Sequence, residues 1–142
     1  MLDAYRDLID ELLGTPSEIR GMVDAASEPD TPRAKHMIAE MRDRDRAVLA
    51  RAQMMTRQEN PYLRTLRLDA AADDRDLSTL LVEMETARGD LVSLLMNLSL
   101  KDWERPAIHE TAGEITLADE VEQHVEFDEE LRQRMRELMT SA

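Results

Sequence analysis

The stretch that decides the fold is RDLSTLLVEMETARGDLVSLLMNLS, residues 75–99. Its apolar residues recur at spacings of three and four, which is the period of an α-helix with one buried face. The members of this stripe are Leu77, Leu80, Leu81, Met84, Ala87, Leu91, Leu94, Leu95 and Leu98. The spacing predicts a long helix over about 75–99. Gly89 in its middle costs roughly 1 kcal/mol against alanine, for which we expect a close helix crossing to compensate.

The N-terminal residues carry a second apolar stripe. In MLDAYRDLIDELL, residues 1–13, the stripe consists of Tyr5, Leu8, Ile9, Leu12 and Leu13. Gly14 follows it directly, and a glycine weakens a helix interior. The next residues, Thr15-Pro16-Ser17-Glu18, combine a capping threonine, a proline at the first helical position and a glutamate that can reach back. We therefore expect the first helix to stop at Gly14 and a new helix to begin at Thr15.

Thr31-Pro32 repeats the threonine–proline pattern and predicts the start of the next helix. This helix turns a stripe of apolar residues inward, namely Met37, Met41, Val48, Ala52 and Met55. It should stop before Pro61, because the residue before a proline disfavours the helical conformation. Residues 60–74 are expected to form the connection to the helix over 75–99.

Pro106 and Gly113 interrupt the helical pattern in residues 101–114, and Thr116 then caps a last helix. The inward residues of this helix alternate at spacings of four and three, as in bundle packing. They are Leu117, Val121, His124, Asp128, Leu131, Met135 and Leu138. Because almost no part of the chain shows the alternating pattern of a strand, we predict an all-α fold. The expected architecture is a four-helix bundle that forms a single domain over residues 1–142.

The composition bounds the function. The chain has 142 residues, a net charge of −13 and no cysteine. Acids interleave with its arginines, so no basic patch suits nucleic acid or an anionic membrane surface. Without cysteine, disulfides and thiolate metal sites are excluded. No apolar run approaches the roughly 20 residues that span a bilayer, and the N-terminus lacks a secretion signal, so we expect a soluble, cytoplasmic protein.

Three segments of the chain resemble the DinB-like family of four-helix bundles. This superfamily also holds bacillithiol transferases and mycothiol-dependent maleylpyruvate isomerases. The most specific part of the resemblance is Asp102-Trp103-Glu104-Arg105-Pro106, followed by His109 and Gly113, and Arg88 also fits. The three segments are 39–63, 86–117 and 126–135. The resemblance spans nearly the whole chain and implies a DinB-like bundle.

Members of this family are similar in binding a divalent metal through three histidines, one on the second helix and two on the last. By the resemblance, these positions fall on Glu40, Phe127 and Leu131 of this chain. None of the three is histidine, and phenylalanine and leucine side chains cannot coordinate a metal. We therefore expect that the metal site of the family has been lost, and the sequence favours no cofactor.

A rearranged site would have to use His36, Glu40, His124 and Asp128, because His124 and Asp128 share a helix face. Two histidines with carboxylates would suit zinc, nickel or iron. The resemblance implies that the two helices run antiparallel. The shifted positions of His36 and His124 would then lie about 10 Å apart along the bundle. This separation weighs against a shared metal.

Structural roles offer the alternative for the same residues. Glu40 has Arg44 and Arg51 on its flank as ion-pair partners, and His124 with Asp128 can form a hydrogen-bonded pair in the core. We also expect an apolar hollow at the family's substrate position, beside His124 and Asp128. Its expected lining is Met37, Met41, Phe127 and Leu131.

Two functions stay open. The sequence favours a metal-free DinB-like bundle that binds a small ligand or a partner, because all three family histidines are replaced. A hydrophobic small molecule would suit the expected hollow, and the resemblance implies a homodimer. The alternative is an enzyme, a metal-dependent hydrolase or thiol S-transferase that uses the rearranged site.

Overall fold

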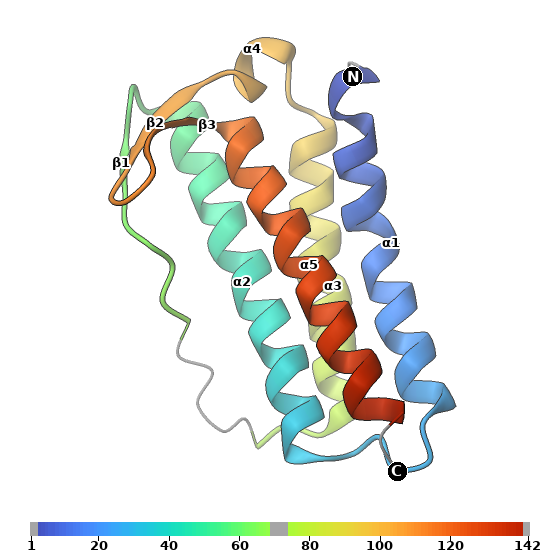
Figure 1. Cartoon of the computed structure of the whole chain (residues 1–142). Coiled ribbons are helices and arrows are strands. Elements are labelled where there is room, and N and C mark those ends of the chain that lie inside the picture. The colour runs from blue at the N-terminus through green and yellow to red at the C-terminus, as the bar shows by residue number, and fades with distance from the viewer. Residues whose placement is uncertain (1–2, 69–73, 141–142) are drawn as a thin grey trace.

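The structure is a computed structural model that describes residues 3–68 and 74–140. Its four long helices are α1 (Asp3–Ala25), α2 (Pro32–Arg57), α3 (Leu77–Met96) and α5 (Leu117–Thr140). They form a four-helix bundle (Figure 1). At one end lie the short helix α4 and three short strands, namely α4 (Leu100–Trp103), β1 (Tyr62–Leu63), β2 (Pro106–His109) and β3 (Gly113–Thr116). The predicted all-α class and bundle are confirmed.

The helices run in pairs. α1 and α5 run in one direction, and α2 and α3 run in the other (Figure 1). Because α2 and α3 are consecutive and parallel, the chain between them returns along the length of the bundle. Residues 69–73 of the predicted connection lie outside the described residues. No helix in the described ranges has a stretch long and apolar enough to cross a membrane.

Two predicted helix starts are confirmed in atomic detail. At the start of α2 the Thr31 hydroxyl accepts a hydrogen bond from the Ala34 amide at 3.1 Å, with Pro32 in the first turn. At the start of α5 the Thr116 hydroxyl accepts from the Asp119 amide at 3.2 Å, and the Asp119 carboxylate accepts from the Thr116 amide at 2.9 Å. Each cap satisfies amides that a helix start leaves without partners.

The predicted break in the first helix is wrong. α1 continues through Gly14 and Thr15 without interruption. Thr15 does not cap a new helix, because its buried hydroxyl donates to the Glu11 carbonyl at 3.1 Å, inside the same helix. A local pattern that is typical of a helix start therefore lies in a helix interior.

Pro16 is tolerated in α1 because another helix supplies the missing hydrogen bond. A proline has no amide hydrogen, so the carbonyl four residues earlier loses its partner. That carbonyl belongs to Leu12, and the Arg88 Nη1 atom of α3 donates to it at 2.7 Å. The continuity of α1 thus depends on a residue 76 positions away, which no local pattern could reveal.

The small sheet was not expected, and its strands lie in the predicted connection over 60–74 and in residues 101–116, where the helical pattern is interrupted. β1 pairs in parallel with β2, with Tyr62 opposite Ile108, and β2 pairs antiparallel with β3. The β2–β3 turn is braced by His109, whose Nδ1 atom accepts from the amides of Thr111 at 3.1 Å and Ala112 at 3.2 Å. Strands of two to four residues are too short for sustained alternation to show in the sequence.

The apolar core divides into two clusters. One lies toward the sheet end and includes Leu12, Leu91 and the fully buried Trp103, which stacks on Tyr5 at 4.5 Å between ring centroids. The other lies toward the opposite end and is rich in methionine. Its members include Met37, Met41, Met84, Leu131 and Met135. The gap between the two clusters is filled by polar side chains.

Gly89 does not lie at a close helix crossing, contrary to the expectation. It is exposed, and an added methyl group would meet no atom within 4 Å. We predict that Gly89→Ala raises the free energy of unfolding by about 0.5–1 kcal/mol, because alanine loses less backbone entropy in a helix. Urea unfolding of the variant measures this. Gly113→Ala is the matched contrast, since its φ of +77° is strained for alanine and stability should fall. Equal effects at the two glycines would contradict this account.

Two helix caps predict a loss of stability in acid. The hydrogen bond from Thr79 holds the pKa of Asp76 below its usual range, and that from the Ser99 amide does the same for Asp102. A lowered folded pKa means that the stabilisation is complete above about pH 4 and is lost as the pH falls further. We expect the double variant Asp76→Asn/Asp102→Asn to lose less stability than the wild type between about pH 5 and pH 3. If the urea midpoints of the variant and the wild type fell by the same amount across this pH range, the prediction would be contradicted.

Candidate functional site

A polar layer crosses the bundle between the two apolar clusters. We define it by Asp45 of α2, Arg88 of α3, and His124 and Asp128 of α5, none more than 1% exposed. Charged groups at this depth are costly unless they are paired and hydrogen-bonded. The layer is therefore the feature of this bundle whose geometry most needs explanation.

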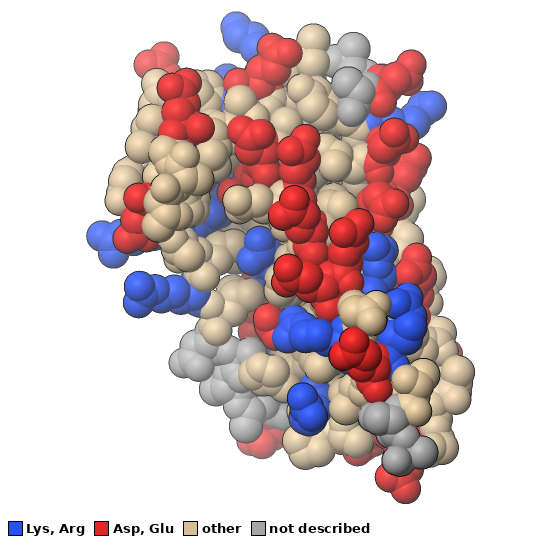
Figure 2. Space-filling view, in the orientation of Figure 1, with Lys and Arg blue, Asp and Glu red and all other residues tan. Residues whose placement is uncertain are grey.

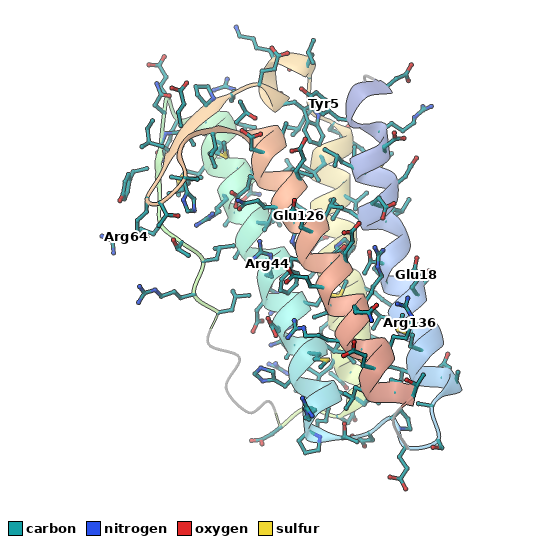
Figure 3. The ribbon with its side chains drawn as sticks, viewed as in Figure 1. Tyr5, Glu18, Arg44, Arg64, Glu126 and Arg136 are labelled. Carbon is teal, nitrogen blue, oxygen red and sulfur yellow. The ribbon has the colours of Figure 1, made fainter. Side chains whose placement is uncertain are left out.

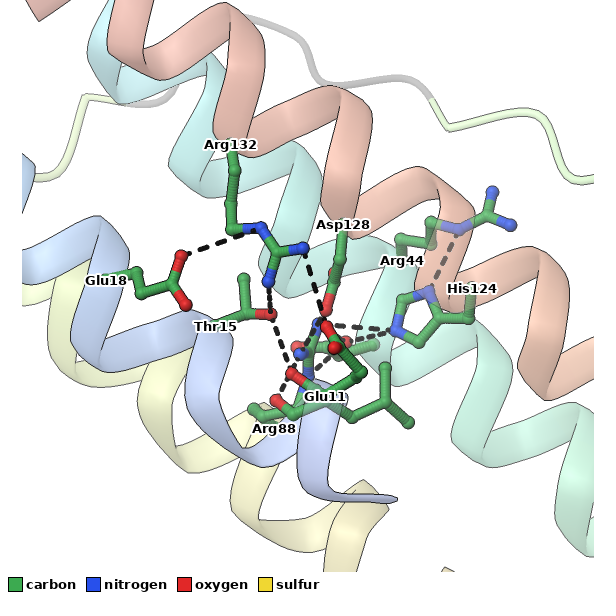
Figure 4. Close-up of polar contacts among 10 residues, drawn as sticks. Glu11, Thr15, Glu18, Arg44, Arg88, His124, Asp128 and Arg132 are labelled. Atoms are coloured by element: carbon green, nitrogen blue, oxygen red, sulfur yellow. Dashed lines mark hydrogen bonds and ion pairs between the residues drawn. The ribbon is translucent and has the colours of Figure 1, made fainter. Parts of the chain in front are cut away.

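Arg88 is the centre of the polar layer (Figure 4). Its Nη1 and Nη2 atoms donate to the two oxygens of Asp128 at 2.7 and 2.8 Å, and its Nε atom donates to Asp45 at 3.0 Å. Nη1 also donates to the Leu12 carbonyl of α1. One guanidinium thus binds the other three long helices, and its pair with Asp128 has the two-pronged geometry of a strong charge-assisted contact.

The charge of Arg88 is secured by these partners. Burial alone lowers the pKa of its guanidinium, but the hydrogen bonds that it donates to Asp128 and the charges of Asp45 and Asp128 outweigh this effect and raise the pKa above its usual range. The cation therefore persists wherever the protein is folded. It contacts both buried carboxylates of the layer, those of Asp45 and Asp128.

The protonation of His124 follows from its neighbours. Its Nδ1 atom lies 3.1 Å from the Arg44 Nε atom, and its Nε2 atom lies 2.6 Å from an Asp45 oxygen. An arginine Nε is a donor, so Nδ1 must accept, and the ring proton sits on Nε2 and is donated to Asp45. The 3.4 Å approach of Arg88 Nη2 to Nε2 joins two donors and is no hydrogen bond.

Arg44 closes the layer toward solvent. Its guanidinium lies 4.5 Å from the ring centroid of Phe127, a cation–π contact, while its Nε atom bonds His124. Burial lowers the pKa of Arg44, and the charge of Glu120 opposes this shift. In Figure 3 the side chain lies between α2 and α5 on the side that faces the viewer. We call this line between the two helices the α2–α5 seam.

Two ion pairs flank Arg44 along the seam. Arg51 donates to Glu120 at 2.7 Å with both side chains buried, whereas Glu40 and the exposed Arg134 lie 3.8 Å apart. The pair at Glu40 corrects the expectation that Arg44 or Arg51 binds this carboxylate. The sequence could not show which residue of α5 faces Glu40.

The expected pair of His124 with Asp128 is also replaced. His124 bonds Asp45 of α2, and Asp128 bonds Arg88 of α3. The two residues share a buried face of α5 as predicted, but each is held by a different helix. His36, the remaining member of the rearranged set, is exposed on α2.

The outer face of α5 changes sign along its length. Exposed acids follow it as far as Glu130, and beyond that point the exposed Arg134 and Arg136 lie beside the exposed Glu137 (Figure 2). Arg132 marks the change and reaches α1, where Nη1 donates to the Thr15 hydroxyl at 3.3 Å. Its guanidinium also lies 3.6 Å from Glu11 and 3.7 Å from Glu18 (Figure 4). These contacts hold α1 beside α5 over the Pro16 turn.

The expected apolar hollow is filled at its proposed lining. Met41 and Leu131 have no exposed surface at all, so no space the size of a water molecule adjoins them. Phe127 is half-buried under Arg44, and Met37 borders a shallow groove of about 340 Å³ beside Leu138. The described residues therefore offer an outer seam at this position rather than an interior pocket.

The three positions at which the resemblance implies metal ligands carry side chains that are engaged elsewhere. Leu131 is packed in the core, Phe127 contacts the Arg44 cation, and Glu40 is paired with Arg134. Among the described residues, no group of three histidine, aspartate or glutamate side chains is arranged to hold a metal. The donors in the polar layer, His124 with two carboxylates, are engaged by arginines instead.

Sequence reasoning missed the central role of Arg88. It lies four residues after Met84 and three before Leu91, which places it on the apolar stripe of its helix. An arginine at an inward position of a stripe indicates a buried ion pair, because such a charge needs partners. Asp45 and Asp128 occupy inward positions of their own helices in the same way.

Comparisons with known proteins bear on the fold alone. No family model matches the chain, and no curated protein matches it. YfiT from Bacillus subtilis, described as a probable metal-dependent hydrolase with an unusual four-helix bundle topology, is similar in structure with a TM-score of 0.80. The match covers 97% of this chain and 87% of that chain, at 18% sequence identity. The two proteins therefore share a fold, which supports the DinB-like fold type.

The polar layer generates a stability prediction. Arg88→Met leaves Asp45 and Asp128 without their cation and should lower the free energy of unfolding by about 3–5 kcal/mol. The triple variant Asp45→Asn/Arg88→Met/Asp128→Asn removes all three charges and should be more stable than the single variant. Urea unfolding measures both.

Arg20→Met is the control for Arg88→Met. It removes a half-exposed ion pair with Glu85 and should cost about 1 kcal/mol or less. Similar losses for Arg20→Met and Arg88→Met would show that the layer does not depend on Arg88.

Proposed function

We propose that this chain is a metal-free DinB-like bundle that binds a ligand or partner at the α2–α5 seam. The observation that carries the proposal is the bond from Arg44 Nε to His124 Nδ1. A histidine that binds a metal often donates its other nitrogen to a carboxylate, as His124 does to Asp45. The nitrogen that would face the metal accepts a hydrogen bond from an arginine here.

The chemistry of the seam supports binding rather than metal catalysis. Both oxygens of Asp128 are bound by Arg88, and Glu40 is paired with Arg134. A divalent cation would have to displace fixed guanidinium charges from each of these donors. Arginines thus supply the positive charge that a metal would bring to such a cluster.

The alternative is a metal-dependent hydrolase or thiol S-transferase. The fold shared with YfiT, described as a probable metal-dependent hydrolase, favours it. It would require His124 and Asp128, with Glu40 or His36, to reach one ion of zinc, nickel or iron. Since His36 is exposed and Asp128 is bound to Arg88, this needs movement of both helices.

Two further properties stay predictions. The resemblance leads us to expect a homodimer, and the acidic chain is expected to bind neither nucleic acid nor membrane. The ligand is proposed to be small and partly apolar, in keeping with Phe127 at the seam. We expect it on the outside of the bundle because Met41 and Leu131 leave no interior space.

Metal content tests the proposal. We expect protein purified without a histidine tag to carry no stoichiometric transition metal by mass spectrometry, before or after chelation. The thermal unfolding midpoint should be the same with zinc as with a chelator. A metal that binds the folded state would raise the midpoint, so an unchanged midpoint indicates that no zinc is bound.

The enzyme alternative makes the opposite prediction. About one equivalent of metal in the wild type, lost in His124→Ala, would replace the proposal with a metal site at His124. His36→Ala tests the other histidine that this alternative can use, and it would lose metal as well if His36 were a ligand. If both variants kept the metal, a site elsewhere in the chain would be indicated, and the proposal would equally fail.

A further inference from the structure

The pairing of the arginines sets Arg44 apart. Among the residues that the structure describes, every other buried or half-buried arginine forms an ion pair with a carboxylate. These are Arg20, Arg42, Arg51, Arg88, Arg105 and Arg132. Arg44 instead contacts an imidazole nitrogen and an aromatic ring. In a chain with 31 acids, a half-buried cation without such a partner is an exception.

The guanidinium of Arg44 is already held in position. Its Nε atom donates to His124, and its guanidinium lies over the ring of Phe127. The rings of Phe127 and His124 are nearly parallel, with 13° between their planes. Its two Nη atoms point away from the polar layer in Figure 4, and no described residue accepts from them. An incoming acceptor would therefore meet a pair of ordered donors, at little cost in side-chain entropy.

We propose that Arg44 and Phe127 form a binding site for a small organic monocarboxylate on the α2–α5 seam. This inference rests on the proposed function, since a bound metal ion would itself attract an anion. The two Nη atoms match the spacing of two carboxylate oxygens. The half-buried Phe127 offers apolar surface next to them, which favours a ligand with a hydrocarbon body over an inorganic anion.

The local charge indicates a single negative charge on the ligand. Along the seam the guanidiniums of Arg51 and Arg134 are paired with Glu120 and Glu40, whereas that of Arg44 forms no ion pair with a carboxylate among the described residues. The Asp45 carboxylate lies on the far side of the His124 ring from Arg44. A ligand from solvent therefore meets the Arg44 guanidinium first.

The burial of Arg44 favours the binding of an anion at this site. The pKa of Arg44 is lowered mainly by loss of water, with Arg51 adding to the effect and Glu120 opposing it. A carboxylate bound to the two Nη atoms of Arg44 would replace the solvation that the guanidinium loses on burial. The net charge of −13 repels anions at long range, but this repulsion is screened beyond about 8 Å at physiological salt.

Titration with sodium benzoate tests the site. Sodium chloride keeps the ionic strength constant, and nuclear magnetic resonance follows the Arg44 Nε–H signal and the amides of α2 and α5. We expect saturable shifts centred on Arg44 and Phe127, with a Kd of about 1 mM, as suits a ligand of this size with one ion pair.

Two variants locate the binding. Arg44→Gln can still donate to His124, so the fold should persist, but benzoate affinity should fall by about tenfold or more. Arg136→Gln removes an exposed arginine whose Nη1 atom contacts Gln133 on the same helix, and it should bind as the wild type does.

Three results would overturn the inference: no saturable shift, equal affinity in Arg44→Gln, or tighter binding of inorganic phosphate than of benzoate. Metal analysis of the same sample separates this inference from the proposed function. A metal-free protein that does not bind benzoate loses only the carboxylate site. A stoichiometric metal removes the proposed function, whatever benzoate does.

Discussion

The requirement to satisfy one buried guanidinium organises this bundle. Arg88 has no access to water, so its donors must find acceptors inside the protein, and they find them on α1, α2 and α5. Apolar packing alone would allow the helices to slide or rotate against one another at modest cost. A guanidinium with three directional partners does not allow such movement. It fixes the rotation of α5 about its axis, which turns His124 and Asp128 toward the interior. The orientation of the seam follows from that rotation.

In the polar layer and along the α2–α5 seam, arginines surround a buried histidine and buried carboxylates. A divalent ion concentrates charge at a point and requires several donors to converge on it. Guanidinium groups spread positive charge over several donor atoms, and they can come from different residues. Arg88 binds Asp128, while Arg44 donates to His124. The donors therefore need not converge. At this level the bundle is held together by side chains of its own.

Local chemistry made part of this structure predictable. The apolar stripes and the threonine caps of α2 and α5 depend on residues within one or two turns, and they appear as expected. The continuity of α1 was not predictable, because the partner of the Leu12 carbonyl comes from α3. The same holds for the site. His124 and Asp128 could be placed on one buried face, but their actual partners, Asp45 and Arg88, depend on how α2 and α3 are arranged around α5.

The course of the chain gives the polar layer a role in folding cooperativity. Arg88 is separated from Asp45 by 43 residues, from Asp128 by 40 and from Leu12 by 76, so its partners arrive from both directions along the sequence. A bundle of α1, α2 and α3 alone would hold the guanidinium with a single carboxylate and without its two-pronged partner. Such an intermediate is penalised by the desolvation of a poorly compensated charge. The layer therefore disfavours partly assembled bundles and makes the docking of α5 part of one concerted transition.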